Sequence, residues 1–155
     1  MTDAPPPIAV VDTCVWLAAY NRKDHHHQAA VTALAAPRIL ITSPLVLDEL
    51  DHLLTGRAGE HIAVEAVTRI GALARTGSLQ IPAVDGRLLG EAEDLMRAYL
   101  GHRLGLTDCV NAALTWRLNR PTILTMDHHY TDVLAPRTRS ERRLEALPGP
   151  IHTPR

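Results

Sequence analysis

The sequence has no phenylalanine, few other aromatic residues, only two cysteines and no long uninterrupted apolar run. Without Phe, the core must consist mainly of Ala, Leu, Val and Ile, which carry most of the 46% hydrophobic share. Cys14 and Cys109 lack the spacing of metal ligands. No apolar run approaches the ~20 residues of a membrane span, and residues 1–7 lack the basic and apolar regions of a signal peptide. We therefore expect a cytoplasmic protein without a membrane segment.

The chain also lacks an excess of charge of either sign, with 16 Lys and Arg against 17 Asp and Glu. Proteins that hold duplex DNA through a broad basic face are usually more basic, so charge alone does not indicate a nucleic-acid partner. An enzyme with an acidic metal centre can still be near neutral, because its carboxylates offset the arginines that hold phosphate. The 155 residues have the length of one domain.

Short apolar segments alternate with helical patterns along the chain. The predicted strands are mainly apolar and cover residues 8–11, 39–42, 79–81 and 122–125. The predicted helices cover 13–20, 24–36 with Asp24 as N-cap, 44–54, 60–75, 87–103 and 107–118. This order predicts an α/β sandwich with a parallel sheet, whose strands are apolar because both faces are covered.

The composition shifts to Arg, Pro and Thr from residue 137. We predict one domain over residues 1–136 and an Arg/Pro-rich tail over 137–155, with a short helix near 141–147. A cluster of four arginines in this tail can contact an RNA backbone or simply be solvated, and both interpretations stay open: Arg137, Arg139, Arg142 and Arg143.

Four carboxylates occur where an apolar fold would normally exclude them. Asp12 directly follows the first predicted strand, and Asp127 follows the last. Because the carboxyl ends of parallel strands share one edge, we expect both to face a crevice at that edge. Glu49 lies three residues after Val46 and four before Leu53, which places it on or beside the inward stripe of its helix.

Asp108 begins a helix that is apolar nearly all round and is therefore predicted to be buried. Asn111 and Thr115 follow at spacings of three and four, which puts three polar side chains on one side of it. Burying several carboxylates is costly without positive charge, and no Lys or Arg adjoins any of the four acids in the sequence. All-oxygen ligands suit Mg²⁺, or alternatively Mn²⁺, which can activate water to hydrolyse a phosphodiester.

Each acid also has an ordinary structural explanation. Asp12 or Asp108 alone can equally be a helix cap, and Glu49 can pair with a distant Arg. A metal site is the better account only for the four acids together.

Two groups of histidines leave alternatives open. His25, His26 and His27 are consecutive, so on a helix they cannot all bind one metal, and a solvated helix start is favoured over an RNA contact. His128 and His129 follow Asp127, and their contact with a scissile phosphate is the less favoured interpretation.

Four segments resemble the signature regions of PIN domains, and most closely those of the VapC-type toxin ribonucleases: VVDTCVW (10–16), SPLVLDEL (43–50), LTDCVNAAL (106–114) and ILTMDHHY (123–130). The resemblance covers about residues 8–135. It implies a three-layer α/β/α sandwich, a homodimer, RNA (often tRNA) as substrate, and an antitoxin peptide laid across the active site.

Carried over by position, the resemblance implies catalytic and metal-binding roles for four acids and supporting roles for two hydroxyls: Asp12, Glu49, Asp108 and Asp127, with Thr13 and Thr107. The chain departs from the family pattern at Gly101, where close relatives often carry an acid, and at Cys109, where Ala is usual. We expect an Mg²⁺-dependent endoribonuclease that is the toxin of a toxin–antitoxin pair. The alternatives are a PIN-fold nuclease of RNA maturation without an antitoxin, and a non-catalytic PIN-fold binding module.

Overall fold

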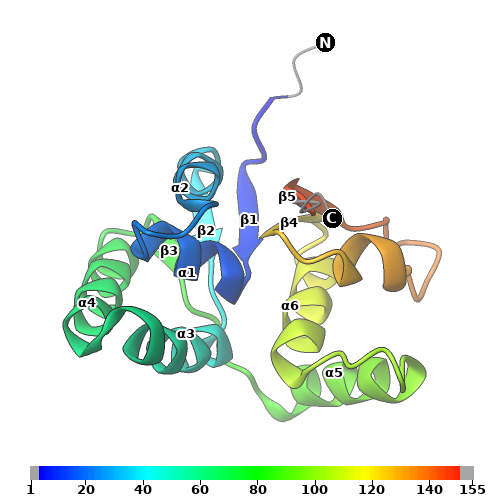
Figure 1. The fold of residues 1–155 in the computed structure, drawn as a ribbon. Helices are drawn as coiled ribbons and strands as arrows, with labels where there is room; N and C mark the ends of the chain where they lie inside the picture. Colours follow the sequence, from blue (N-terminus) through cyan, green and yellow to red (C-terminus); the bar gives the residue numbers. More distant parts are fainter. Residues whose placement is uncertain (1–3, 151–155) are drawn as a thin grey trace.

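The computed structural model describes residues 4–150 and contains one five-stranded parallel sheet (Figure 1). Its strands are β1 (Ile8–Val11), β2 (Ile39–Ile41), β3 (Leu79–Gln80), β4 (Thr122–Thr125) and β5 (Glu145–Pro148). They lie in the order β3-β2-β1-β4-β5, and every neighbouring pair is parallel. The central strands β1 and β4 are therefore adjacent in the sheet although they are far apart in the sequence.

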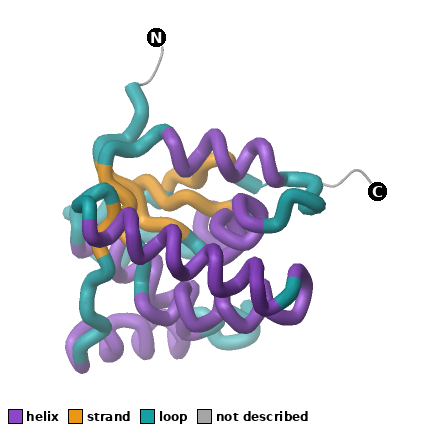
Figure 2. The backbone as a smooth tube through the Cα atoms, turned by 90° about the vertical axis from the view of Figure 1, so that its left-hand side faces the viewer, coloured by secondary structure: helices purple, strands orange, loops and turns teal. Residues whose placement is uncertain are grey.

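Helices cover both faces of this sheet. They are α1 (Thr13–Tyr20), α2 (His27–Ala35), α3 (Pro44–Ala58), α4 (Glu60–Arg75), α5 (Gly86–Ala98), α6 (Leu106–Arg117) and the π-helix η1 (His129–Val133). Val11 and Leu124 pack with α1 to α4, whereas Val10 and Ile123 pack with α5 and α6. This alternation gives two cores on opposite faces of the sheet. The predicted α/β sandwich is confirmed, and Figure 2 shows helices in front of the strands.

Three predicted helix boundaries are wrong. The helix predicted over 24–36 begins only at His27, because the Asp24 side chain accepts the backbone N–H of His26 at 2.8 Å in a turn. The helix predicted to end at residue 54 continues to Ala58 and ends at Gly59, whose φ of 98° suits glycine. The helix predicted over 87–103 ends at Ala98, and Gly101 then adopts a φ of 97°.

The short helix predicted near residues 141–147 is also wrong. Glu145–Pro148 forms β5, which pairs with β4 at the edge of the sheet. Leu144 is buried just before it, and the Trp116 indole N–H donates to the Arg142 carbonyl at 2.9 Å. An isolated helix of this length is marginal, whereas pairing satisfies the backbone groups of β4. Part of the predicted tail therefore belongs to the sheet, and residues 151–155 lie outside the described residues.

Among residues 4–150, no helix combines the length and the apolar character that crossing a bilayer requires.

Candidate metal centre

Asp12 lies at the carboxyl end of β1, in the middle of the sheet. Its backbone N–H donates to the carbonyl of Leu124 in β4 at 2.9 Å. Its carboxylate caps α1 by accepting the N–H of Thr13 at 2.8 Å, as the helix-cap alternative allows. The side chain is only 5% exposed. This position is therefore fixed by the sheet and by the helix together.

Three further side chains donate hydrogen bonds to the Asp12 carboxylate. The Thr125 hydroxyl donates to Oδ2 at 2.8 Å, and the Asn111 amide Nδ2 donates to Oδ1 at 3.2 Å. The Cys14 thiol lies 3.5 Å from Oδ2, and burial together with the charge of Asp12 raises its pKa to about 12. Cys14 thus remains a neutral donor at physiological pH and not a thiolate.

Tyr130 connects Asp12 to Asp108. The Asn111 amide donates to the Tyr130 hydroxyl at 3.2 Å, and this hydroxyl donates to Asp108 Oδ1 at 3.3 Å. Asp108 Oδ2 accepts the backbone N–H of Gly105 at 3.0 Å at the start of α6. The helical spacing predicts Asn111 beside Asp108, whereas no sequence pattern predicts a role for Tyr130. Its position three residues after Asp127 could have indicated a role at the site, since the hydroxyl of a buried tyrosine needs a hydrogen-bond partner.

Asp127 and Glu49 lie on a more open side of the same edge. Asp127 is partly buried, and its backbone N–H donates to the Thr125 hydroxyl at 3.0 Å, so Thr125 links it to Asp12. Glu49, on α3, is exposed and reaches the other acids only through its charge. Glu49 therefore lies beside the buried stripe of α3 and not on it, since the buried residues of this helix are Val46, Leu50 and Leu54.

Two of the four carboxylates, Asp12 and Asp108, have a raised pKa. Burial, and then the charge of Asp108, raise the pKa of Asp12 from 3.8 to about 6. Burial also raises the pKa of Asp108, with smaller contributions from the charges of Asp127 and Glu49. Within residues 4–150 none of these four acids forms an ion pair with Lys or Arg. The edge of the sheet therefore gathers negative charge that no Lys or Arg of the described residues neutralises.

The residues present fit a divalent cation. Besides the carboxylates, the Thr13 hydroxyl and the Asn111 amide oxygen are buried and have no hydrogen-bond partner in the described part of the chain. Thr107 lies next to Asp108 at the start of α6. An all-oxygen donor set with uncompensated charge is typical of Mg²⁺ and Mn²⁺ sites. The assignment of individual ligands stays a prediction.

The histidines near the N-terminus have a structural explanation in part. His25 is exposed, and His27 Nδ1 lies 2.9 Å from the Ala18 carbonyl of α1. In the predicted basic cluster, Arg137 pairs with Glu141 and stacks 5.0 Å above the Trp116 ring. Contacts of these groups with RNA stay predictions, as does a phosphate contact of His128 and His129.

Comparison with known proteins gives consistent results. The family model of the PIN domain matches residues 9–134. Ribonuclease VapC26 of Mycobacterium tuberculosis is 25% identical over 128 residues, which are 82% of this chain and 92% of that protein. The crystal structure of M. tuberculosis VapC20, described as a Sarcin-Ricin loop cleaving toxin, gives a TM-score of 0.69 at 24% identity, covering 78% of this chain and 90% of that one. A chain of the Rickettsia felis VapBC2 structure, bound to a DNA fragment from its promoter, gives a TM-score of 0.59 at 18% identity. The match covers 90% of this chain and 98% of that one. The two solved structures share the fold of this chain.

Proposed function

The chain belongs to the PIN domain family, and from this premise we propose that it is an Mg²⁺-dependent endoribonuclease acting as the toxin of a toxin–antitoxin pair. The observation that carries the proposal is the group of three carboxylates whose charges interact with that of Asp108, at the carboxyl edge of the sheet, where α/β proteins bind ligands. The similarity to VapC26, a ribonuclease, and to VapC20, a Sarcin-Ricin loop cleaving toxin, supports the choice of RNA.

In this proposal Asp12, Glu49, Asp108 and Asp127 hold the ion, Mg²⁺ or alternatively Mn²⁺, and Thr13 and Thr107 support them. When bound, the ion supplies activation of water and stabilisation of the charge that develops on the phosphate. The hydrogen bonds from Thr125 and Asn111 hold Asp12 in one orientation, and the Tyr130 hydroxyl does the same for Asp108. These hydrogen bonds fix the orientation of the two carboxylates before an ion binds.

Protonation would compete with metal binding at Asp12. With a pKa of about 6, this carboxylate is mainly ionised above neutral pH and increasingly protonated below pH 6. A bound cation favours the ionised form. We therefore expect metal-dependent cleavage to weaken as the pH falls through this range.

Restraint of the toxin by an antitoxin is part of the same proposal. The VapBC2 structure, which is similar in fold, supports a partner of this kind. We expect the antitoxin to place a basic side chain among the carboxylates, since that charge would compensate them as a metal does. A homodimer, a cytoplasmic location and tRNA as the substrate stay predictions.

The test is incubation of the purified protein with total RNA in Mg²⁺, Mn²⁺ or EDTA. Asp12→Asn is the test variant, and Asp48→Asn, a substitution of an exposed acid on α3, is the matched control. We expect cleavage that requires metal, disappears in Asp12→Asn and persists in Asp48→Asn. Cleavage that survives both EDTA and Asp12→Asn would contradict the proposed centre. Folded, antitoxin-free protein that cuts no RNA at all would favour the binding-module alternative.

A further inference from the structure

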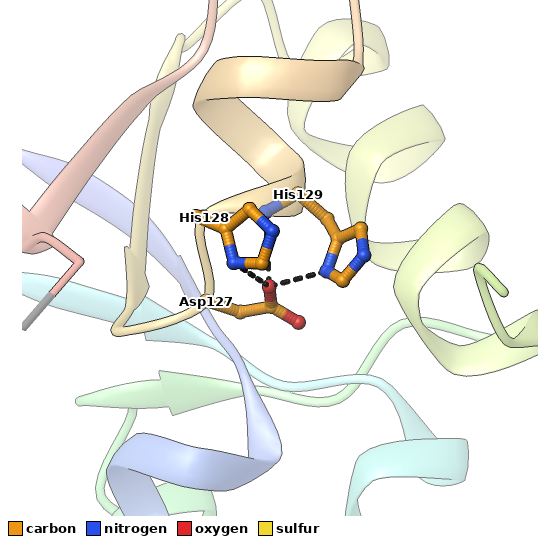
Figure 3. A group of neighbouring side chains, drawn as sticks. All are labelled: Asp127, His128 and His129. Carbon is orange, nitrogen blue, oxygen red and sulfur yellow. Dashed lines mark hydrogen bonds and ion pairs between the residues drawn. The ribbon is translucent and has the colours of Figure 1, made fainter. Parts of the chain in front are cut away.

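The turn after β4 brings a carboxylate and two imidazoles to one point (Figure 3). One potential ligand atom from each of Asp127, His128 and His129 lies within 4.8 Å of the other two. His129 Nδ1 is 2.6 Å from Asp127 Oδ1, and His128 Nδ1 is 3.7 Å from the same oxygen. Both rings therefore present a nitrogen to one carboxylate oxygen.

This arrangement is held by the backbone as well as by the rings. The His129 backbone N–H donates to Asp127 Oδ1 at 2.9 Å, and the Asp127 N–H donates to the buried Thr125 hydroxyl at 3.0 Å. The two imidazoles stack with their centroids 4.3 Å apart and their planes at 29°. The convergence of three donors is thus a property of a folded turn and not of a loose loop.

The donor set is chemically different from the all-oxygen group of acids. Two nitrogens and one oxygen suit Zn²⁺, Co²⁺ or Ni²⁺ better than Mg²⁺. In a tetrahedral zinc site with bonds of about 2.0–2.1 Å, neighbouring ligand atoms are about 3.3 Å apart, and the observed 2.6 and 3.7 Å lie on either side of this value. An ion that bound all three atoms would bring both distances towards this value.

The three side chains are also accessible to an ion from solution. Their exposed fractions are 57% for His128, 32% for Asp127 and 27% for His129. Asp127 and Asp108 lie close enough for their charges to interact, and two neighbouring negative charges favour a cation here. Three protein ligands leave an open position for water.

We propose that Asp127, His128 and His129 form a second metal site that takes a transition-metal ion of the Zn²⁺ type. This site shares Asp127 with the proposed Mg²⁺ centre. An ion bound to both histidines would engage the Asp127 carboxylate and weaken Mg²⁺ binding at the acids, so Zn²⁺ would inhibit the nuclease. That consequence rests on the proposed function, whereas Zn²⁺ binding itself does not.

The test is titration of the untagged, metal-free protein with Co²⁺, followed by visible absorption, and with Zn²⁺, followed by calorimetry. We expect one ion per chain. His128→Gln and His129→Gln should each weaken binding by at least the roughly 10–100-fold that loss of an outer-shell partner costs in metal sites. The double substitution His25→Asn with His26→Asn removes another pair of adjacent histidines and should leave the affinity unchanged.

Circular dichroism checks that the variants are folded, and His128→Gln changes the most exposed of the three ligands. Unchanged affinity in both single variants, loss of affinity in the control, or no stoichiometric binding would each overturn the proposal. RNA cleavage in Mg²⁺ alone is measured separately. Active enzyme without Zn²⁺ binding refutes only this second site, and Zn²⁺ binding without any cleavage refutes only the proposed nuclease.

Discussion

The site has a buried side and an open side, and the two are built differently. The buried side consists of fully or almost fully buried residues: Asp12, Asn111, Thr125 and Tyr130. Their polar groups are joined by hydrogen bonds of 2.8 to 3.2 Å. Every one of these bonds joins residues that are distant in the sequence, so this side exists only in the folded chain.

The open side consists of residues with substantial exposure: Glu49, Asp127, His128 and His129. Its hydrogen bonds are mostly local, within the turn that follows β4. Asp108 connects the two sides. It accepts a hydrogen bond from Tyr130, and the charges of Asp127 and Glu49 raise its pKa. The comparison indicates that long-range contacts fix the buried side, whereas the open side depends on one turn and on an exposed residue of α3.

The largest loss of activity is expected on substitution of Asp108, which connects the buried side and the open side. Asp108→Asn should reduce Mg²⁺-dependent RNA cleavage about 1000-fold, because a metal ligand contributes several kcal/mol to the stabilisation of the transition state. The variant should remain folded, since the amide oxygen can still accept the Gly105 N–H. Single-turnover cleavage and thermal melting measure the two results. A loss of less than about 10-fold would show that the two sides do not form one centre.

A large effect on stability is expected only on the buried side. A carboxylic acid with a raised pKa binds its proton more tightly in the folded state, so metal-free protein loses stability as the pH rises from about 4 through 6. Above about pH 6 the loss in the free energy of unfolding is complete, and it amounts to up to about 3 kcal/mol for a rise of about two pKa units. Asp12→Asn removes the ionisation. Its free energy of unfolding relative to that of the wild type should therefore be higher at pH 7.5 than at pH 4.

Denaturant unfolding in EDTA at the two pH values measures this difference. Mg²⁺ should reduce it, because the ion stabilises the wild type by binding its folded state. An equal difference between variant and wild type at pH 4 and pH 7.5 would contradict the account of Asp12.

The open side should show loss of activity without loss of stability. Glu49→Gln should reduce cleavage roughly 10–100-fold, while its exposed position limits the change in stability to about 0.5 kcal/mol. Asp48→Asn, the neighbouring exposed acid, should change neither quantity. If Glu49→Gln were as active as Asp48→Asn, Glu49 would not belong to the site.

The smallest effect is expected on removal of the Tyr130 hydroxyl, which links the buried side to Asp108. Tyr130→Phe removes the hydroxyl between Asn111 and Asp108 and should lower the free energy of unfolding by about 1 kcal/mol. It should also weaken Mn²⁺ binding, measured by electron paramagnetic resonance. Tyr20→Phe, at a half-buried ring in the other core, is the control. Equal stability of the two variants would mean that this link does not stabilise the site.

The sequence predicts the open side and the strand ends better than the buried network. Apolar strands indicated the parallel sheet, and the positions of Asp12 and Asp127 after two of them indicated the edge at which they meet. Tyr130 has no periodic pattern that points to Asn111, because their contact depends on how α6 packs beside the turn after β4. β5 was missed for a similar reason, since the segment EALP carries no strand pattern and is stabilised by β4 and Trp116.

The most direct test of the central claim is an anomalous difference map from crystals grown with Mn²⁺. The account predicts a peak in contact with the carboxylates of Asp12 and Asp108, on the side where Glu49 and Asp127 can reach it. A fully occupied peak elsewhere with none among the four acids, or a peak confined to Asp127, His128 and His129, would contradict it.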